Sequence, residues 1–154
     1  MAPSDLEQYL YQKIPLSRVI QVSAIEVNEL TVRLRAPLTP NMNHRATVFG
    51  GSAVAVAILS AWSLLHVRLH AVTAGASIVI QRHSMTYDRP MHGDFAARAA
   101  LAAPEDWPAF MRNLQRWGKA RISVNSVLEY DNEQAGLFSG EFVAFVGELC
   151  IGAN

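Results

Sequence analysis

The chain has 154 residues, with 13 Lys or Arg against 13 Asp or Glu, so its formal net charge is zero. A chain of this length can bury a core of its own, and we expect a single domain over residues 1–154. Zero net charge and scattered basic residues exclude the electrostatic signature of a nucleic-acid-binding protein. The one cysteine, Cys150, excludes an internal disulfide and a cysteine-rich metal site, and it favours a reducing compartment, which we expect to be the cytoplasm.

The N-terminal part of the chain predicts a helix followed by a hairpin. Residues 4–13 start with an N-cap serine, Ser4, and carry apolar residues at helical spacing up to a proline. From Arg18 the apolar residues alternate with polar ones, which predicts two antiparallel strands over 18–27 and 30–35. Two prolines then end regular pairing.

The stretch from Asn43 to Arg68 organises the rest of the chain. It reads NHRATVFGGSAVAVAILSAWSLLHVR, a short polar lead-in and two glycines before a long apolar segment. Apolar residues on every side predict a helix that is buried over its whole circumference. At about 1.5 Å per residue, a helix over 52–68 is roughly 25 Å long. That length, and the serines and histidine within it, argue against a membrane span.

The second half predicts four more strands and one more helix. Two strands flank a turn over 88–94, and two others flank a polar turn. An amphipathic helix between these pairs has Phe110, Leu114 and Trp117 on one side and ends at Gly118. The predicted strands cover 76–87, 95–101, 120–130 and 136–146, and the helix lies within 104–118.

These elements predict an α+β fold in which one antiparallel sheet wraps around the central helix. Six strands joined mainly by hairpins bury their apolar faces best against a helix that is apolar all round. One sheet cannot cover the whole circumference of a helix. A second copy of the same sheet is the simplest cover for the far side, so we expect a homodimer with a shared core.

Several motifs resemble the hotdog-fold acyl-CoA thioesterases. They are the FGGS sequence at the helix entry, the later Tyr87-x-Arg89-Pro90-x-x-Gly93-Asp94, and the two closing strands. The lead-in Asn43-His44-x-x-Thr47-x-Phe49-Gly50-Gly51-Ser52, together with Trp62-Ser63-Leu64-Leu65, is more narrowly similar to thioesterases of the YiiD C-terminal-domain type. The likeness runs from about Arg18 to the end of the predicted sheet and implies a hotdog fold.

The resemblance implies hydrolysis of an acyl-CoA or acyl carrier thioester in a site at a dimer interface. No metal or cofactor is implied apart from the coenzyme A of the substrate, and pairing of dimers into tetramers stays open. The tetrahedral intermediate carries negative charge on the carbonyl oxygen, which backbone N–H groups at a helix N-terminus can stabilise. We expect the N–H of Gly51 to do so, with Gly50 and Phe49 shaping the approach of the substrate.

The sequence also departs from the related phenylacetyl-CoA-type enzymes. Those enzymes place an Asn eight residues before the second glycine, and Asn43 stands at that spacing from Gly51. Its amide could orient the water or the carbonyl, or it could be an ordinary turn residue. They also place an Asp or Glu seven residues after that glycine, where this chain has Ile58. The base or nucleophile of the family mechanism is therefore missing from this helix.

Three residues are candidates to replace the missing acid. His44 comes first because it is next to Asn43 in the lead-in, although a loop histidine can be merely solvated. Asp88 comes second, from the end of the following strand, where it could also stabilise its own turn. Ser60 comes third, and small serines on this helix are better explained by hydrogen bonds to backbone carbonyls and close packing of the sheet.

Basic side chains could bind the phosphates of coenzyme A. We prefer Arg89, in the turn that resembles the family motif, and then Arg82. The other cations considered are Arg112, Arg116, Lys119 and Arg121.

Two other functions remain open. A module that binds an acyl thioester without cleaving it is favoured by Ile58 and by the absence of an acid between Gly51 and Arg68. A hotdog dehydratase or hydratase would also act on acyl thioesters, but the His-and-acid signature of those enzymes is not recognisable in this sequence.

Overall fold

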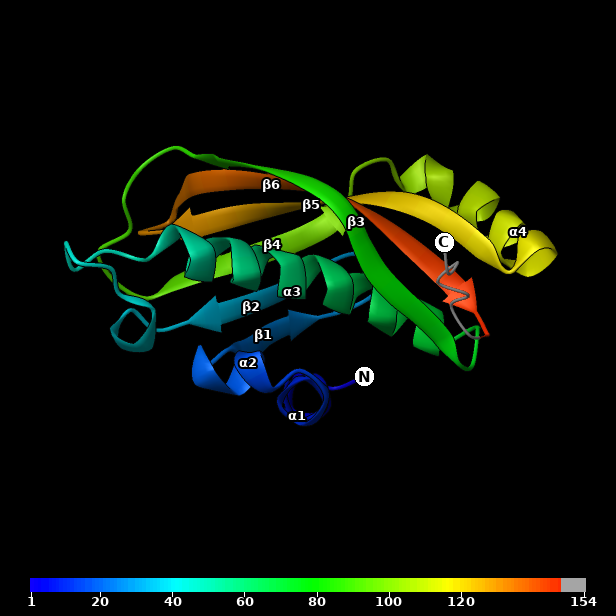
Figure 1. Ribbon diagram of the computed structural model, residues 1–154, viewed down its shortest axis with the longest axis horizontal. Helices are drawn as coiled ribbons and strands as arrows, with labels where there is room; N and C mark the ends of the chain where they lie inside the picture. The colour runs from blue at the N-terminus through cyan, green and yellow to red at the C-terminus, as the bar shows by residue number, and fades with distance from the viewer. Residues whose placement is uncertain (148–154) are drawn as a thin grey trace, which may run out of the picture.

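The computed structural model describes residues 1–147, and Cys150 lies outside this range. Its elements, drawn in Figure 1, are α1 (Pro3–Lys13), α2 (Pro15–Val19), β1 (Ser23–Val27), β2 (Val32–Ala36), the short 3₁₀ helix η1 (Thr39–Asn41), α3 (Gly50–His70), β3 (Ala76–Tyr87), β4 (Phe95–Leu101), the 3₁₀ helix η2 (Pro104–Asp106), α4 (Trp107–Trp117), β5 (Lys119–Tyr130) and β6 (Glu133–Val146).

The six strands form one antiparallel sheet in the order β1-β2-β4-β5-β6-β3, and this sheet curves around α3 (Figure 1). Along β5, buried and more exposed residues alternate as the sequence pattern requires, so one face packs on the helix and the other faces solvent. The predicted α+β arrangement of a sheet around a central helix is confirmed.

α3 forms the centre of the hydrophobic core. Leu64 and Leu65 are fully buried, on a helix that packs against β2, β3, β4, β5 and β6. By length and composition α3 could cross a bilayer, but 61% of its most apolar window is buried inside the domain, as in the core helix of a globular fold. Truncating a buried leucine such as Leu64 would cost about 2–5 kcal/mol.

The predicted boundaries needed several corrections. The alternating pattern from Arg18 lies partly in the short helix α2, and the first strand begins only at Ser23. Proline at the first position and a following turn let residues 15–19 form this helix. Ser4 is not the N-cap of α1, since the helix begins at Pro3. Trp117 does not share the buried side of α4 with Phe110 and Leu114, because it is 67% exposed.

Two tight turns connect adjacent elements, one between β5 and β6 and one between α4 and β5. β5 and β6 are joined by Asp131 and Asn132, both at positive φ, the conformation of the two-residue turns that suit a twisted hairpin. At the end of α4, Gly118 is left-handed and donates its N–H to the carbonyl of Leu114. Gly118 therefore stops the helix as predicted, and the chain enters β5 at the next residue.

Aromatic rings fix α1 to the surface of α3. Tyr9 of α1 stacks on His66 at 4.4 Å between ring centres, and Trp62 lies 4.9 Å from the same imidazole. His70 follows one turn later at 5.7 Å. No acceptor or donor for Nε2 of His66 lies within hydrogen-bond distance among residues 1–147.

This contact predicts a pH-dependent stability. Burial, and to a smaller extent the neighbouring His70, lowers the pKa of His66. The unfolded chain therefore takes up this proton at a higher pH than the folded protein. The contribution of His66 to stability is complete above its unfolded pKa of about 6.5 and is lost as the pH falls toward the lower pKa of the folded state.

The variant His66→Phe keeps an aromatic ring that cannot be protonated. Its Tm should fall less than that of the wild type between about pH 7.5 and 5.5, measured by circular dichroism. His92→Gln, at an exposed position, serves as the control and should follow the wild type. Parallel curves for the wild type and His66→Phe would contradict the assignment.

Candidate active site

The lead-in to α3 is a loop closed by the side chain of Asn43. Oδ1 of Asn43 accepts the N–H of Arg45 at 2.9 Å and that of Thr47 at 3.2 Å, and Nδ2 donates to Oγ1 of Thr47 at 2.9 Å. Ala46 lies within this loop at φ 59°, a left-handed conformation that the hydrogen bonds around it hold in place. Both polar ends of the Asn43 amide are therefore occupied by the loop.

Backbone hydrogen bonds hold the residues that directly precede α3. Phe49 donates its N–H to the carbonyl of Asn41 at 2.7 Å, and Val48 donates to Met91 at 2.9 Å. Asn41 is 1% exposed and anchors this segment by donating its amide to the carbonyls of Ile20 and Pro37. These bonds fix the direction in which the helix begins.

The N-terminus of α3 has no capping side chain. Its N-cap residue is Phe49, which has no side-chain acceptor. Within residues 1–147, no acceptor is found for the N–H groups of Gly50, Gly51 and Ser52. Three donors and the positive end of the helix dipole are thus available to a ligand.

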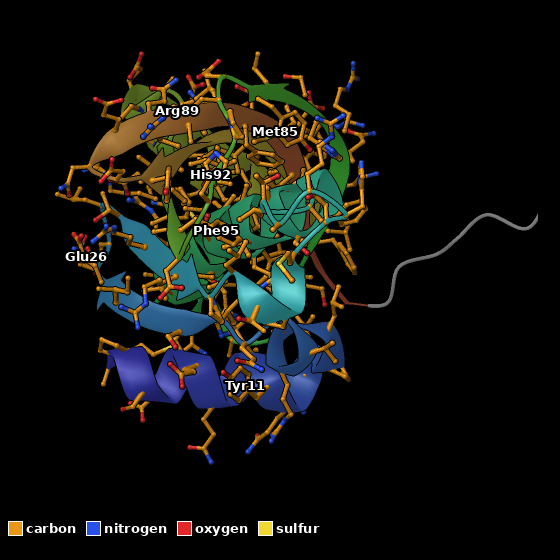
Figure 2. All side chains as sticks on the ribbon, turned by 90° about the vertical axis from the view of Figure 1, so that its left-hand side faces the viewer. Tyr11, Glu26, Met85, Arg89, His92 and Phe95 are labelled. Atoms are coloured by element: carbon orange, nitrogen blue, oxygen red, sulfur yellow. The ribbon has the colours of Figure 1, made fainter. Side chains whose placement is uncertain are left out.

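A hollow of about 510 Å³ opens beside this helix start. Gly50 and Gly51 line one side of it, and the turn after β3 lines the other. The remaining wall is mostly apolar and consists of Val48, Ala53, Pro90, Met91 and Ala135. Figure 2 views the molecule from this end, where Arg89 and His92 of the same turn are labelled.

Tyr87 and Asp88 bring the end of β3 to the helix start. The hydroxyl of Tyr87 donates to the carbonyl of Gly50 at 2.9 Å. Asp88 donates its N–H to the carbonyl of Ala135, and its carboxylate accepts from Nε2 of Gln134 at 3.2 Å. Asp88 supplies the one carboxylate among the described residues that line the hollow. Tyr87 was not among the predicted site residues, although it is the first residue of the motif that resembles the family.

The two preferred arginines do not both lie at this site. Arg89 lines the hollow, but its guanidinium also donates to the carbonyl of Tyr130 and lies 3.6 Å from a carboxylate oxygen of Glu133. Arg82 lies on β3 away from the hollow, with its Nε 3.7 Å from Glu141. Arg89 therefore ties the turn to the β5–β6 hairpin, and Arg82 belongs to the sheet surface.

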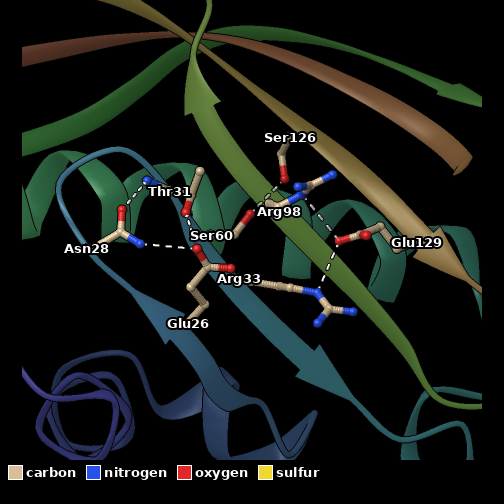
Figure 3. Close-up of polar contacts among 8 residues, drawn as sticks. All are labelled: Glu26, Asn28, Thr31, Arg33, Ser60, Arg98, Ser126 and Glu129. Atoms are coloured by element: carbon tan, nitrogen blue, oxygen red, sulfur yellow. Dashed lines mark hydrogen bonds and ion pairs between the residues drawn. The ribbon is translucent and has the colours of Figure 1, made fainter. Parts of the chain in front are cut away.

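The other candidates for the missing base lie apart from the hollow. His44 is exposed in the lead-in loop and is not part of the lining. Ser60 is fully buried, donates to the carbonyl of Ala57 at 2.8 Å, and lies 2.7 Å from the hydroxyl of Ser126 (Figure 3). Ser60 thus joins α3 to β5 inside the core, and the sheet covers it.

Phe49 contacts Gly51 rather than the wall of the hollow. A Cβ on Gly51 would lie 2.4 Å from Cε1 of the Phe49 ring, so the ring rests directly on this glycine. The ring is 56% exposed. Gly51 is therefore required for close packing on one side, while its other side faces the hollow.

Comparison with known proteins assigns the family. A family model described as "Putative thioesterase (yiiD_Cterm)" matches residues 3–146. The chain belongs to this thioesterase family. The resemblance seen in the sequence is confirmed, and with it the enzyme class.

Solved structures show the same hotdog fold as this thioesterase-family chain. A protein of unknown function from Chlorobaculum tepidum has a TM-score of 0.88 at 24% identity, with 94% of each chain covered. A putative thioesterase from Shewanella oneidensis has a TM-score of 0.79 at 22% identity, covering 94% of this chain and 97% of that one. A probable thioesterase from Pseudomonas aeruginosa has a TM-score of 0.80 at 22% identity, with coverage of 95% and 97%.

The role of Asn43 in its loop gives a stability prediction. In Asn43→Ala, the N–H groups of Arg45 and Thr47 lose their acceptor, so the free energy of unfolding should fall by about 1–2 kcal/mol in urea denaturation. Asn43→Asp keeps the acceptor oxygen, so its free energy of unfolding should fall by less. Equal losses in the two variants would show that the loop does not depend on Oδ1.

Proposed function

We propose that the protein hydrolyses acyl-CoA or acyl carrier thioesters by attack of water, at the start of α3. The observation that carries this proposal is the uncapped helix N-terminus, which opens into a hollow that also holds a carboxylate. Donors for an oxyanion and a base for water are the two groups that such hydrolysis needs.

The backbone supplies the oxyanion donors. The thioester carbonyl oxygen accepts the N–H of Gly51, with the neighbouring free N–H groups of the first turn close by. As water attacks, charge grows on this oxygen, so the fixed N–H groups and the helix dipole stabilise the transition state more than the substrate. Gly50 has no side chain to block the carbonyl on its way in.

Asp88 supplies the base. Its carboxylate takes a proton from water while the water oxygen bonds to the acyl carbon. The tetrahedral intermediate then collapses, the carbon–sulfur bond breaks, and the thiolate takes the proton back from Asp88. The products are a carboxylic acid and a thiol, and none of these reaction steps needs a metal or cofactor. The hydrogen bond from Gln134 holds the carboxylate at the hollow. Arg89 keeps its place as a candidate for the substrate phosphates.

A homodimer is part of the proposal. β3 is an edge strand of the sheet, and most of its residues are exposed on both faces. On α3, Val54 and Ile58 are only half-buried. A second copy of the chain could pair with this edge strand and cover the half-buried side chains of α3.

Light scattering of a dilute sample should give twice the mass of the chain, and a monodisperse monomer would contradict the proposed homodimer.

A second candidate is a module that binds the thioester without cleaving it. It is favoured by Ile58, which stands on the half-exposed side of α3, and by the largely apolar wall of the hollow. Recovery of intact acyl-CoA after tight binding would support this function instead.

The test of hydrolysis is thiol release from a panel of acyl-CoAs of increasing chain length. Asp88→Asn removes the base while keeping its size, so kcat should fall by about 10²- to 10⁴-fold. Asp131→Asn, the same change in the exposed β5–β6 turn, is the matched control and should keep wild-type kcat.

Two results would count against the proposal in different ways. No turnover above background for any chain length would reject hydrolysis. Turnover that is equal in Asp88→Asn and in the wild type would keep hydrolysis but remove Asp88 as its base.

A further inference from the structure

A second and larger hollow lies at the opposite end of the molecule from the start of α3. It measures about 590 Å³ and is lined by residues of α4 and β5, namely Asn113, Trp117, Lys119, Ala120 and Arg121. Arg68, near the end of α3, stacks on Trp107 at the beginning of α4, 4.0 Å from its ring centre. Figure 1 shows α4 at the far end of α3 from the first turn. The proposed catalytic site does not use this hollow.

The walls of the hollow combine an exposed aromatic ring with polar groups. Trp117 is 67% exposed, although Phe110 and Leu114 of the same helix are buried. Asn113 lies one turn before it on α4 and lines the same wall. An indole held at solvent beside an amide can stack on a planar ring and hydrogen-bond to its edge.

The charge around the hollow is positive. Lys119 and Arg121 line it, and the guanidinium of Arg116 lies over one face of the Trp117 ring, 4.7 Å from its centre, so a base would stack on the opposite face. Arg121 shares Glu141 with Arg82 on the sheet surface. For Lys119 and Arg116, no carboxylate within ion-pair distance is found among residues 1–147. In a chain of zero net charge, this excess of cations is local.

We propose that this hollow binds an adenine nucleotide with a diphosphate, its base against Trp117 and its phosphates at Lys119 and Arg121. Stacking on an indole suits a purine, and ammonium and guanidinium groups suit phosphate oxygens. The volume is in the range of small-molecule sites. The side-chain amide of Asn113 would hydrogen-bond to the edge of the base.

Two sources can supply this chemistry, a free nucleotide or the nucleotide end of coenzyme A. The 21 residues of α3 separate the two ends of the helix by about 30 Å. The pantetheine arm of one coenzyme A is too short to join the two hollows of one chain over that distance. Coenzyme A bound here would therefore present its thioester to a second copy, and its phosphates would lie at Lys119 and Arg121 instead of Arg89. This source rests on the proposed function and homodimer.

Calorimetric titration with ADP tests the site without any turnover. ADP should bind more tightly than inorganic phosphate or adenosine alone. Trp117→Ala should weaken ADP binding at least about fivefold, and Trp117→Phe should weaken it less because a ring remains. Lys119→Gln combined with Arg121→Gln should weaken it about tenfold or more, whereas Arg112→Gln, an exposed α4 charge outside the hollow, should not.

The two sources give different kinetics with acyl-CoA and with an acyl-pantetheine that lacks the nucleotide. If coenzyme A is the ligand, Trp117→Ala raises KM for acyl-CoA more than KM for acyl-pantetheine. If a free nucleotide is the ligand, the two KM values change alike while ADP affinity still falls. ADP binding that is absent, or unchanged in Trp117→Ala, overturns the proposal even when thioesters are hydrolysed. If the wild type binds ADP as expected but hydrolyses no thioester, only the proposed function is rejected.

Discussion

Burial of a helix that is apolar around its whole circumference is the constraint on which this structure depends. α3 has no polar stripe broad enough to face water, so the antiparallel sheet must curve around it. The strand order places β4 and β5 in the middle of this sheet and β3 at one edge. The buried bond between Ser60 and Ser126 lets helix and sheet approach closely without leaving those hydroxyls unpaired.

The same burial fixes the position of the site. Because the core holds α3 along its length, the first turn can be left uncapped at the surface. Asn41 holds the chain just before this turn through the N–H of Phe49, and Tyr87 holds the end of β3 against Gly50. The proposed catalytic groups are thus on rigid supports: backbone donors on a packed helix, and a carboxylate in a turn that is bonded to the start of β6.

Much of the fold could be predicted because its signals are local or periodic. The all-round apolar pattern of α3, the alternation in β5 and the glycine after α4 each follow from one stretch of sequence. The short helix α2 could not be predicted because Pro15 indicates the end of α1, and the last two residues of α2, Arg18 and Val19, already fit the alternating pattern of the strand after it. The exposure of Trp117 could not be predicted either, since helical spacing places it beside Phe110 and Leu114 while the corner between α4 and β5 leaves it uncovered.

The candidate site was predicted only in part. The glycines at the helix entry were visible in the sequence, but the partner acid was ranked behind His44, because distance along the chain favours a neighbour in the lead-in. Sheet topology places Asp88, and not His44, at the hollow: the last residue of β3 contacts the first residue of α3, 37 positions earlier, and Asp88 follows it.

The most direct measurement is a crystal structure with an acyl-CoA analogue in which a ketone replaces the thioester and cannot be hydrolysed. We expect the ketone oxygen at about 2.7–3.1 Å from the backbone nitrogen of Gly51, with the carboxylate of Asp88 facing the acyl carbon through one water. A ketone bound away from the first turn of α3, or one whose carbon cannot be reached from Asp88, would contradict it.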